Sequence, residues 1–341
     1  MTEHVSAPVN KHQSPLTADG VNGWEDLSGL LPASRGWMHS GVAILGDGRI
    51  LCAHPEGRQL LVMDPSGRFE TIPTPLSEMH SIVTSNLCGA EVIAVADPGH
   101  RFVENPANAA EYTDHFSPGR AVILNRDGSI LLELECPPLP AYAHESWRPT
   151  SIALDDSHHT GSGDIWVADG YGASLVHRFA ASGQYIGTID GSETGTAFSC
   201  PHGIMLRTDR GHLEIYVADR ANRRIVVVDE NGTDPRVLGG GDLDSPSSLV
   251  LVEDRLYVTE LFGGVARFDG ETFTCVLERG RPRSSEDDAW PNRRMANGLD
   301  SYPVAPGYFN SPHGITADDE WLYVTEWFIG GRLIRLSLQQ F

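Results

Sequence analysis

A unit of four short apolar strands recurs along the chain, and this repeat constrains the fold more than any other feature of the sequence. Four clear copies begin at RPTSIAL, CPHGIML, SPSSLVL and SPHGITA, and their second strands read DIWVADG, EIYVADR, RLYVTEL and WLYVTEW. Two weaker copies precede them and begin at HSGVAIL and MHSIVTS. Self-similarity of this kind is typical of propellers, in which each unit is one blade. The repeat therefore predicts an all-β, six-bladed β-propeller with four antiparallel strands per blade.

Tight turns support this count because each separates two apolar strands at a matching place in its unit. The turn dipeptides are Ser66-Gly67, Asp127-Gly128, Ser182-Gly183, Asn231-Gly232 and Asp269-Gly270. Such dipeptides tolerate the positive φ angles of tight hairpins. A helical alternative is excluded because the apolar runs are short, rich in β-branched residues and bounded by glycine.

The sixth unit lacks an obvious fourth strand before the chain reaches Phe341. We expect residues 24–31, which precede the first unit, to supply that strand and close the ring. Residues 1–20 have the composition of a disordered segment. We therefore expect one propeller domain over residues 21–341.

The charge and cysteine content of the chain limit the kinds of partner and the cellular location that we expect. The 341 residues include 25 basic and 46 acidic ones, a formal charge of −21, which repels nucleic acid and anionic lipid. We expect neither partner, no signal peptide and no membrane span, and we predict a small-molecule substrate. The five cysteines are odd in number and lack CxxC spacing, which indicates reduced thiols and a cytoplasmic location. The oligomeric state stays open.

The residues at the start of the innermost strand of each blade form a ring at one mouth of the channel. In blade order this ring reads Ser40, His80, Thr150, His202, Ser247 and His313. Three neutral imidazoles on alternate blades, with an open fourth position, are a catalytic zinc arrangement. One Pro-His-Gly turn is explained equally by a histidine that caps its strand, but three in one register favour a metal. We predict Zn²⁺ bound by His80, His202 and His313, with other divalent transition metals as alternatives.

A second set of residues stands at the end of the next strand of each blade, on the same rim. We expect its acidic members to accept backbone N–H groups: Asp97, Asp169, Asp219, Glu260 and Glu326. Tyr171 and Arg220 follow two of these strands and face the predicted zinc. We interpret them as a catalytic acid/base and an oxyanion clamp. The alternative for each is packing or a surface ion pair.

Three further residues are weaker candidates, for substrate binding. His39 lies one position out of register with the ring, and His54 and Arg58 follow the second strand of blade one. Long insertions at residues 98–118 and 279–309 fall on the same face. They are either lids over the site or insertions without a functional role.

The motifs around these residues resemble those of a known family. They are MHS at His80, PHG at His202, PHG at His313, ADGYG at Tyr171 and VADRANRRI at Arg220. The chain is similar in these motifs to NHL-repeat propellers and, among them, to peptidyl-α-hydroxyglycine α-amidating lyase, the lyase domain of peptidylglycine α-amidating enzyme. The resemblance covers roughly residues 38–341. It implies a zinc held by the three histidines, with Tyr171 and Arg220 in the active site.

Three positions depart from the family pattern. Pro55 stands where the family has an arginine after the second strand of blade one, with Arg58 close by. Gly172 stands in place of a cysteine, and Gly314 stands in place of the aspartate that binds calcium in the family. Because glycine offers no side-chain oxygen, we expect no calcium there.

Together these features predict a zinc-dependent lyase that cleaves the C–N bond of a carbinolamide or a similar hydroxylated small molecule. Two alternatives stay open: a zinc-dependent hydrolase of a lactone, amide or ester, and a non-catalytic propeller scaffold that binds a ligand on its rim. Metal content separates the scaffold from the enzymes. Incorporation of solvent oxygen separates the hydrolase from the lyase.

Overall fold

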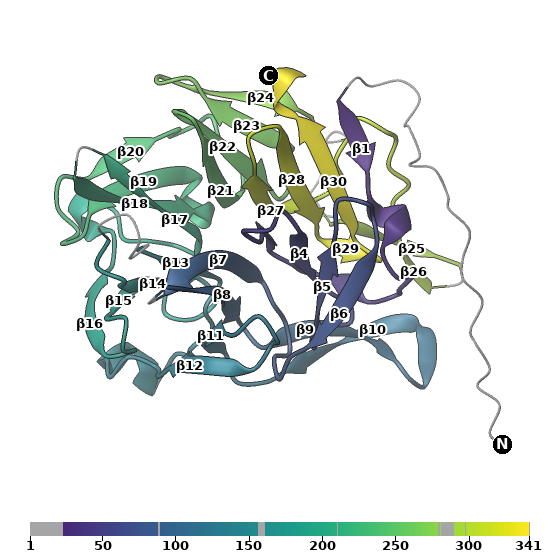
Figure 1. Cartoon of the computed structure of the whole chain (residues 1–341), viewed down its shortest axis with the longest axis horizontal. Coiled ribbons are helices and arrows are strands. Elements are labelled where there is room, and N and C mark those ends of the chain that lie inside the picture. Colours follow the sequence, from purple (N-terminus) through teal and green to yellow (C-terminus); the bar gives the residue numbers. More distant parts are fainter. Residues whose placement is uncertain are drawn as a thin grey trace.

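The fold of the chain is a ring of six four-stranded antiparallel sheets, as Figure 1 shows. The computed structural model describes residues 23–87, 89–155, 161–209, 211–278, 280, 290–296 and 298–340. The innermost strand of each sheet contacts the innermost strands of the two neighbouring sheets, so these six strands form a closed ring. The predicted six-bladed β-propeller is confirmed.

Within a blade the strands follow one another outward from the channel. The first three blades contain β3 (Val42–Ile44), β4 (Ile50–Ala53), β5 (Gln59–Met63) and β6 (Phe69–Pro73); β7 (Ser81–Leu87), β8 (Ala90–Asp97), β11 (Arg120–Leu124) and β12 (Ile130–Leu134); and β13 (Ser151–Leu154), β14 (Ile165–Asp169), β15 (Leu175–Phe179) and β16 (Tyr185–Ile189).

The other three blades repeat this order, and the last takes its outermost strand from the N-terminal side. They contain β17 (Pro201–Asp209), β18 (His212–Asp219), β19 (Arg224–Asp229) and β20 (Arg236–Leu238); β21 (Pro246–Val252), β22 (Arg255–Glu260), β23 (Val265–Phe268) and β24 (Phe273–Leu277); and β27 (Pro312–Ala317), β28 (Trp321–Glu326), β30 (Arg332–Ser337) and β1 (Trp24–Asp26).

The pairing of β1 with β30 closes the ring. Trp24 lies opposite Leu336, and its buried ring packs 5.0 Å, centroid to centroid, from the ring of Phe309. The predicted fourth strand of the sixth blade is therefore present within residues 24–31. Residues 1–22, which include the predicted disordered segment, lie outside the described residues.

The hydrophobic core lies between neighbouring blades. Ile93 of β8 packs with Leu51 of blade one, whereas the next residue, Ala94, packs with Ile152 of blade three. Successive strand residues point to opposite faces of a sheet, so a middle strand that is covered on both faces is apolar throughout. Each fully buried valine, leucine or isoleucine side chain stabilises the fold by about 1.5–3 kcal/mol.

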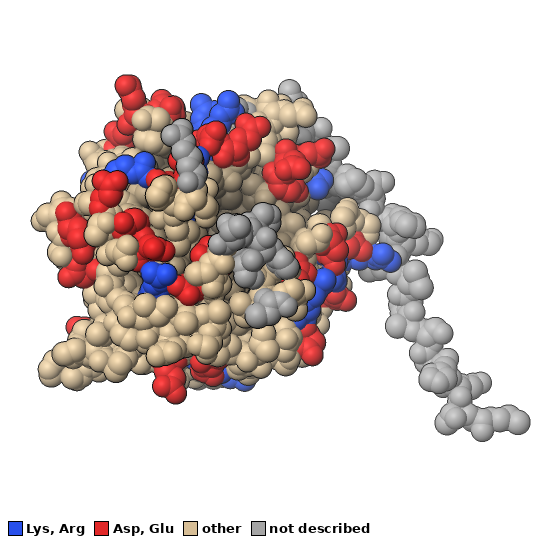
Figure 2. Space-filling view, turned by 60° about the vertical axis from the view of Figure 1, so that its left-hand side comes forward, with Lys and Arg blue, Asp and Glu red and all other residues tan. Residues whose placement is uncertain are grey.

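The predicted turns and thiols match the structure where it describes them. The glycines of all five turn dipeptides have positive φ, for example 81° at Gly67 and 86° at Gly183, a conformation that glycine adopts at no steric cost. Cys52, Cys136, Cys200 and Cys275 are free thiols. Acidic side chains are spread over the face shown in Figure 2, with basic ones among them, as the net charge of −21 implies.

Both insertions contain β-hairpins. Residues 98–118 form β9 (His100–Asn105) and β10 (Asn108–Phe116), and residues 279–309 include β25 (Asn292–Met295) and β26 (Gly298–Ser301), with 279, 281–289 and 297 outside the described residues. β10 lies against β26, so the two insertions contact each other. A third short pair joins β2 (Trp37–Met38) to β29 (Phe328–Ile329).

The helices of the described part are short 3₁₀ turns. They are η1 (Ser28–Leu30), η2 (Pro140–Ala143), η4 (Ser192–Thr194), η5 (Arg220–Asn222) and η6 (Leu338–Gln340). None of these described helices has the length and apolar character needed to cross a membrane.

Candidate metal centre

The three histidines of the ring are buried, and each is held by the backbone of the next blade. Every Nδ1 donates to the carbonyl oxygen of the following ring residue: His80 to Thr150 (2.5 Å), His202 to Ser247 (2.9 Å) and His313 to Ser40 (3.1 Å). A carbonyl oxygen only accepts, so Nδ1 carries the hydrogen of each ring. The lone pair of each neutral imidazole is therefore on Nε2.

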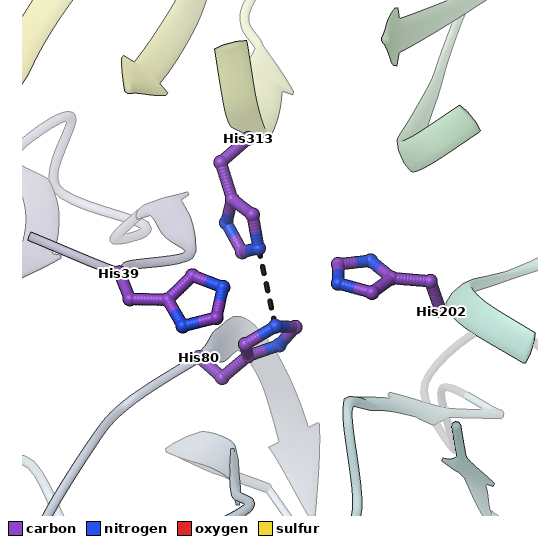
Figure 3. A group of neighbouring side chains, drawn as sticks. All are labelled: His39, His80, His202 and His313. Carbon is purple, nitrogen blue, oxygen red and sulfur yellow. Dashed lines mark hydrogen bonds between the residues drawn. The ribbon is translucent and has the colours of Figure 1, made fainter. Parts of the chain in front are cut away.

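These Nε2 atoms converge. The Nε2 atoms of His80 and His313 lie 3.1 Å apart, the distance marked by the dashed line in Figure 3. With both hydrogens on Nδ1, two lone pairs face each other across this gap, an arrangement that a shared cation stabilises. Nitrogens about 2.05 Å from a tetrahedral zinc lie roughly 3.3 Å from each other. The spacing of this pair thus fits a common metal ion.

His39 joins the three ring histidines. Its ring centroid lies 4.2 Å from that of His80 and 4.4 Å from that of His313. One ligand atom from each of the four residues lies within 4.8 Å of the others, and Figure 3 shows the four rings pointing toward one another. The cluster of His39, His80, His202 and His313, named here the four-histidine cluster, can hold a metal ion.

The four imidazoles are neutral. Burial lowers the pKa of each well below 6.5, and the positive charge of Arg220 nearby lowers these pKa values further. Metals bind the neutral form of imidazole, so the site is ready to bind one without losing protons first.

Tyr171 and Arg220 lie beside the four-histidine cluster, as their positions in the repeat predicted. The Tyr171 hydroxyl donates to Nε2 of His202 at 3.1 Å and lies 3.4 Å from Nε2 of His80. Arg220 donates from Nη1 to the Tyr171 hydroxyl (3.4 Å) and from Nη2 to Oγ of Ser247 (2.8 Å). Burial raises the pKa of Tyr171, so the phenol stays protonated.

The guanidinium of Arg220 contacts two hydroxyl groups. Its Nε is buried without a hydrogen bond, and no acidic residue of the described part forms an ion pair with it. A positively charged group without a counter-ion beside neutral imidazoles attracts a negatively charged or electron-rich group of a ligand.

The acidic residues at the ends of the second strands are structural, as expected. Asp97 accepts the backbone N–H groups of Ser77, Glu78 and Gly99, at 2.7, 3.1 and 2.8 Å. Most of the amides bound by these acids belong to the segment that leads into the first strand of the same blade, so each acid anchors the start of the strand that carries its ring residue.

His54 and Arg58 are not brought to the four-histidine cluster. His54 accepts the N–H of Glu56 at 3.1 Å, and exposed Arg58 lines a separate surface cleft of about 510 Å³ together with Ser77 and His115. Within the described ranges no hydrogen bond or ring contact joins either residue to the four histidines. Their predicted role in substrate binding stays a prediction.

Glu78 is a residue of the site that sequence reasoning missed. It is 4% exposed, and its Oε1 lies within hydrogen-bonding distance of Nδ1 of His39, at 2.6 Å. The signal that could have identified it is its position in SEMHS, two residues before His80. The repeat itself gave no reason to expect a buried carboxyl group there, because its structural acids stand at the ends of the second strands.

Packing explains the glycines that depart from the family pattern. A Cβ at Gly314 would lie 2.6 Å from Oγ1 of Thr325 and 2.7 Å from the carbonyl oxygen of Ser40. A Cβ at Gly172 would lie 2.4 Å from the Asp169 carboxylate. Neither position accepts a side chain without displacing its neighbours.

The structure is a six-bladed propeller with a histidine cluster that can hold a metal ion, and comparisons with known proteins agree on the fold. None of the known protein-family models matches the chain. A streptogramin B lyase structure matches with a TM-score of 0.55 and 18% identity, covering 92% of this chain and 97% of that one. A gluconolactonase from Xanthomonas campestris matches with a TM-score of 0.54 and 12% identity, covering 92% and 89%.

One curated protein adds a similarity in sequence. The chain is 35% identical over 80 residues to peptidyl-alpha-hydroxyglycine alpha-amidating lyase 2 of Drosophila melanogaster. This alignment covers 23% of the chain and spans 18% of the length of that relative. The resemblance predicted from the motifs is confirmed as a local similarity.

Proposed function

We propose that this protein is a zinc-dependent lyase that cleaves the C–N bond of a carbinolamide or a similar hydroxylated small molecule. The observation that supports it most is a buried set of neutral imidazoles within hydrogen-bonding distance of the Tyr171 hydroxyl, which Arg220 contacts in turn. The local similarity to an α-amidating lyase supports the same class of reaction.

The donor set fits zinc. His80, His202 and His313 would hold the ion, because their Nδ1 hydrogens are bound by carbonyl oxygens and their Nε2 lone pairs converge. A zinc ion held there acts as a Lewis acid that makes a bound hydroxyl group more acidic.

Tyr171 and Arg220 then move the proton and stabilise the charge. Tyr171 takes up the proton of the substrate hydroxyl and gives its own to the departing nitrogen. The oxygen electron pair forms the new C=O bond as the C–N bond breaks, and Arg220 stabilises the negative charge on that oxygen. The products are a carbonyl compound and an amide, and no water is consumed.

Product analysis in isotopically labelled water tests this proposal. Zinc-loaded protein is incubated with a small N-acyl carbinolamide, and metal-free protein corrects for spontaneous decomposition. We expect a zinc-dependent release of amide that contains no solvent oxygen. A carboxylic acid that carries solvent oxygen would identify a hydrolase instead. Zinc binding without turnover of any carbinolamide, lactone or amide would favour the scaffold.

A further inference from the structure

His39 reaches the metal centre by a route that the blade repeat does not provide. The segment that precedes blade one crosses the end of blade six, where Trp37 pairs with Ile329 and Met38 with Phe328. This pairing places the ring of His39 against the rings of His80 and His313. His39, the residue that follows β2, is therefore held beside the ring histidines by β29, a strand from the other end of the chain.

The partner of His39 differs from those of the ring histidines. Their Nδ1 atoms bind backbone carbonyls, whereas Nδ1 of His39 binds the Glu78 carboxyl group at 2.6 Å. The backbone N–H of Glu78 donates to Asp97, so the residue is fixed at both ends. With Nδ1 engaged by Glu78, the second nitrogen of His39 faces the four-histidine cluster (Figure 3).

The carboxylate of Glu78 is buried, so its charged form needs a positive charge nearby to be stable. Its Oε2 is buried without a hydrogen bond. The positive charges of Arg101 and Arg148 act on it from a distance, but no lysine or arginine of the described part lies within ion-pair distance of it. A buried carboxylate is costly unless it is paired or lies close to a metal. A dication bound by neutral imidazoles keeps its full charge, and the carboxylate of Glu78 lies one imidazole away from it. Such carboxylate–histidine–metal arrangements orient a ligand and increase its basicity.

We infer that His39 is a fourth protein ligand of the metal and that Glu78 is the positioning residue which orients it and balances the charge of the ion. The inference rests on the metal site of the proposed function and deepens it. The ion would then be held by four imidazoles, and a substrate hydroxyl would have to bind as a fifth ligand, a coordination number that zinc sometimes reaches in catalytic sites. His39 would belong to the metal centre and not to the substrate pocket.

Counting the ligands tests this inference without any substrate. X-ray absorption of the zinc-loaded full-length protein gives the number of coordinated imidazoles, and competition with a chelator gives the affinity. We expect four imidazoles in the wild type and three in His39→Gln, whose amide still donates to Glu78. Affinity should fall at least 100-fold in His39→Gln and roughly 10- to 100-fold in Glu78→Gln. The matched control His54→Gln, on the same blade, should match the wild type.

Three imidazoles in the wild type would overturn the inference, and so would unchanged affinity in both His39→Gln and Glu78→Gln. The count on the wild type decides even if a variant fails to fold. Four coordinated imidazoles without lyase turnover would contradict the proposed function and leave the ligand assignment standing. Three coordinated imidazoles with lyase turnover would support the proposed function and overturn the assignment of His39 as a ligand.

Discussion

The even-numbered and odd-numbered blades use the same ring position in different ways. Blades two, four and six place a histidine there, and blades one, three and five place a serine or threonine whose backbone carbonyl accepts from the histidine before it. The ring histidines are thus contributed by half of the blades, and their rings are oriented by the backbone of the other half. An odd blade serves its neighbour through its backbone, which a side-chain substitution does not remove.

The odd blades also support the two residues beside the metal centre. Oγ1 of Thr150 accepts the N–H of Gly170, the residue before Tyr171, at 3.2 Å. Oγ of Ser247 accepts from Arg220 at 2.8 Å. The comparison therefore separates two roles: even blades supply the ring imidazoles, and hydroxyls of odd blades contact the segment that carries Tyr171 and the guanidinium of Arg220.

The largest effect should come from removing an even-blade ligand. His202→Ala should reduce zinc content from about one equivalent per chain to nearly none, because it leaves the remaining imidazoles without their partner across the ring. Ser247→Ala, at the neighbouring odd-blade position, should keep the full zinc content, since its carbonyl is unchanged. Elemental analysis of both variants after dialysis measures this. Full zinc retention in His202→Ala would break the assignment.

The next largest effect should be on turnover. Tyr171→Phe removes one hydroxyl, so kcat should fall by roughly 10²–10⁴-fold if that hydroxyl relays a proton. Zinc content should stay at the wild-type level, because the phenol is not among the expected ligands. Arg220→Lys, which loses the planar guanidinium, should also be impaired. The measurement is kcat beside metal content. Near-normal turnover in Tyr171→Phe would remove the tyrosine from the mechanism and favour the hydrolase.

An intermediate effect should appear in the pH dependence of stability. The pKa of buried His202 is well below 6.5 in the folded protein, so below pH 6.5 the unfolded chain binds a proton that the folded chain does not. Zinc-free protein should therefore lose stability as pH falls, with an upper limit of about 2 kcal/mol for this residue between pH 7 and pH 5, which the unfolded pKa sets.

Chemical denaturation at both pH values compares wild type with His202→Ala. The variant should lose less stability than the wild type on acidification. Burial raises the pKa of Glu78 to about 8, which acts with the opposite sign, and it is present in both proteins. Equal losses in the two proteins would show that His202 is not held neutral by the fold.

The smallest effect should come from the odd-blade hydroxyl. Ser247→Ala removes one of the two hydrogen bonds that the Arg220 guanidinium makes with described residues, and such a bond contributes about 0.5–1.5 kcal/mol. We expect kcat to fall by roughly 2- to 12-fold, with zinc content unchanged. Steady-state kinetics checks this. A loss as large as that of Tyr171→Phe would mean that the odd blades contribute more than positioning.

Much of the site could be predicted because it repeats with the blades. His80, His202 and His313 share one register, and Tyr171 and Arg220 follow the second strands of their blades, so the count of strands places them on one rim. His54 follows a second strand too, yet its ring bonds within its own turn. The repeat predicts the rim of a side chain but not its direction.

The sequence by itself determined the six blades and the alternation of histidines around the channel, because both depend on strand register and on turns between adjacent strands. Only the tertiary structure decided that His39 joins the four-histidine cluster and that the Glu78 carboxyl group contacts His39. That decision depends on the pairing of β2 with β29, strands from opposite ends of the chain. Nothing in the local sequence of either segment encodes their contact, since it arises when closure of the ring brings the two ends of the chain together.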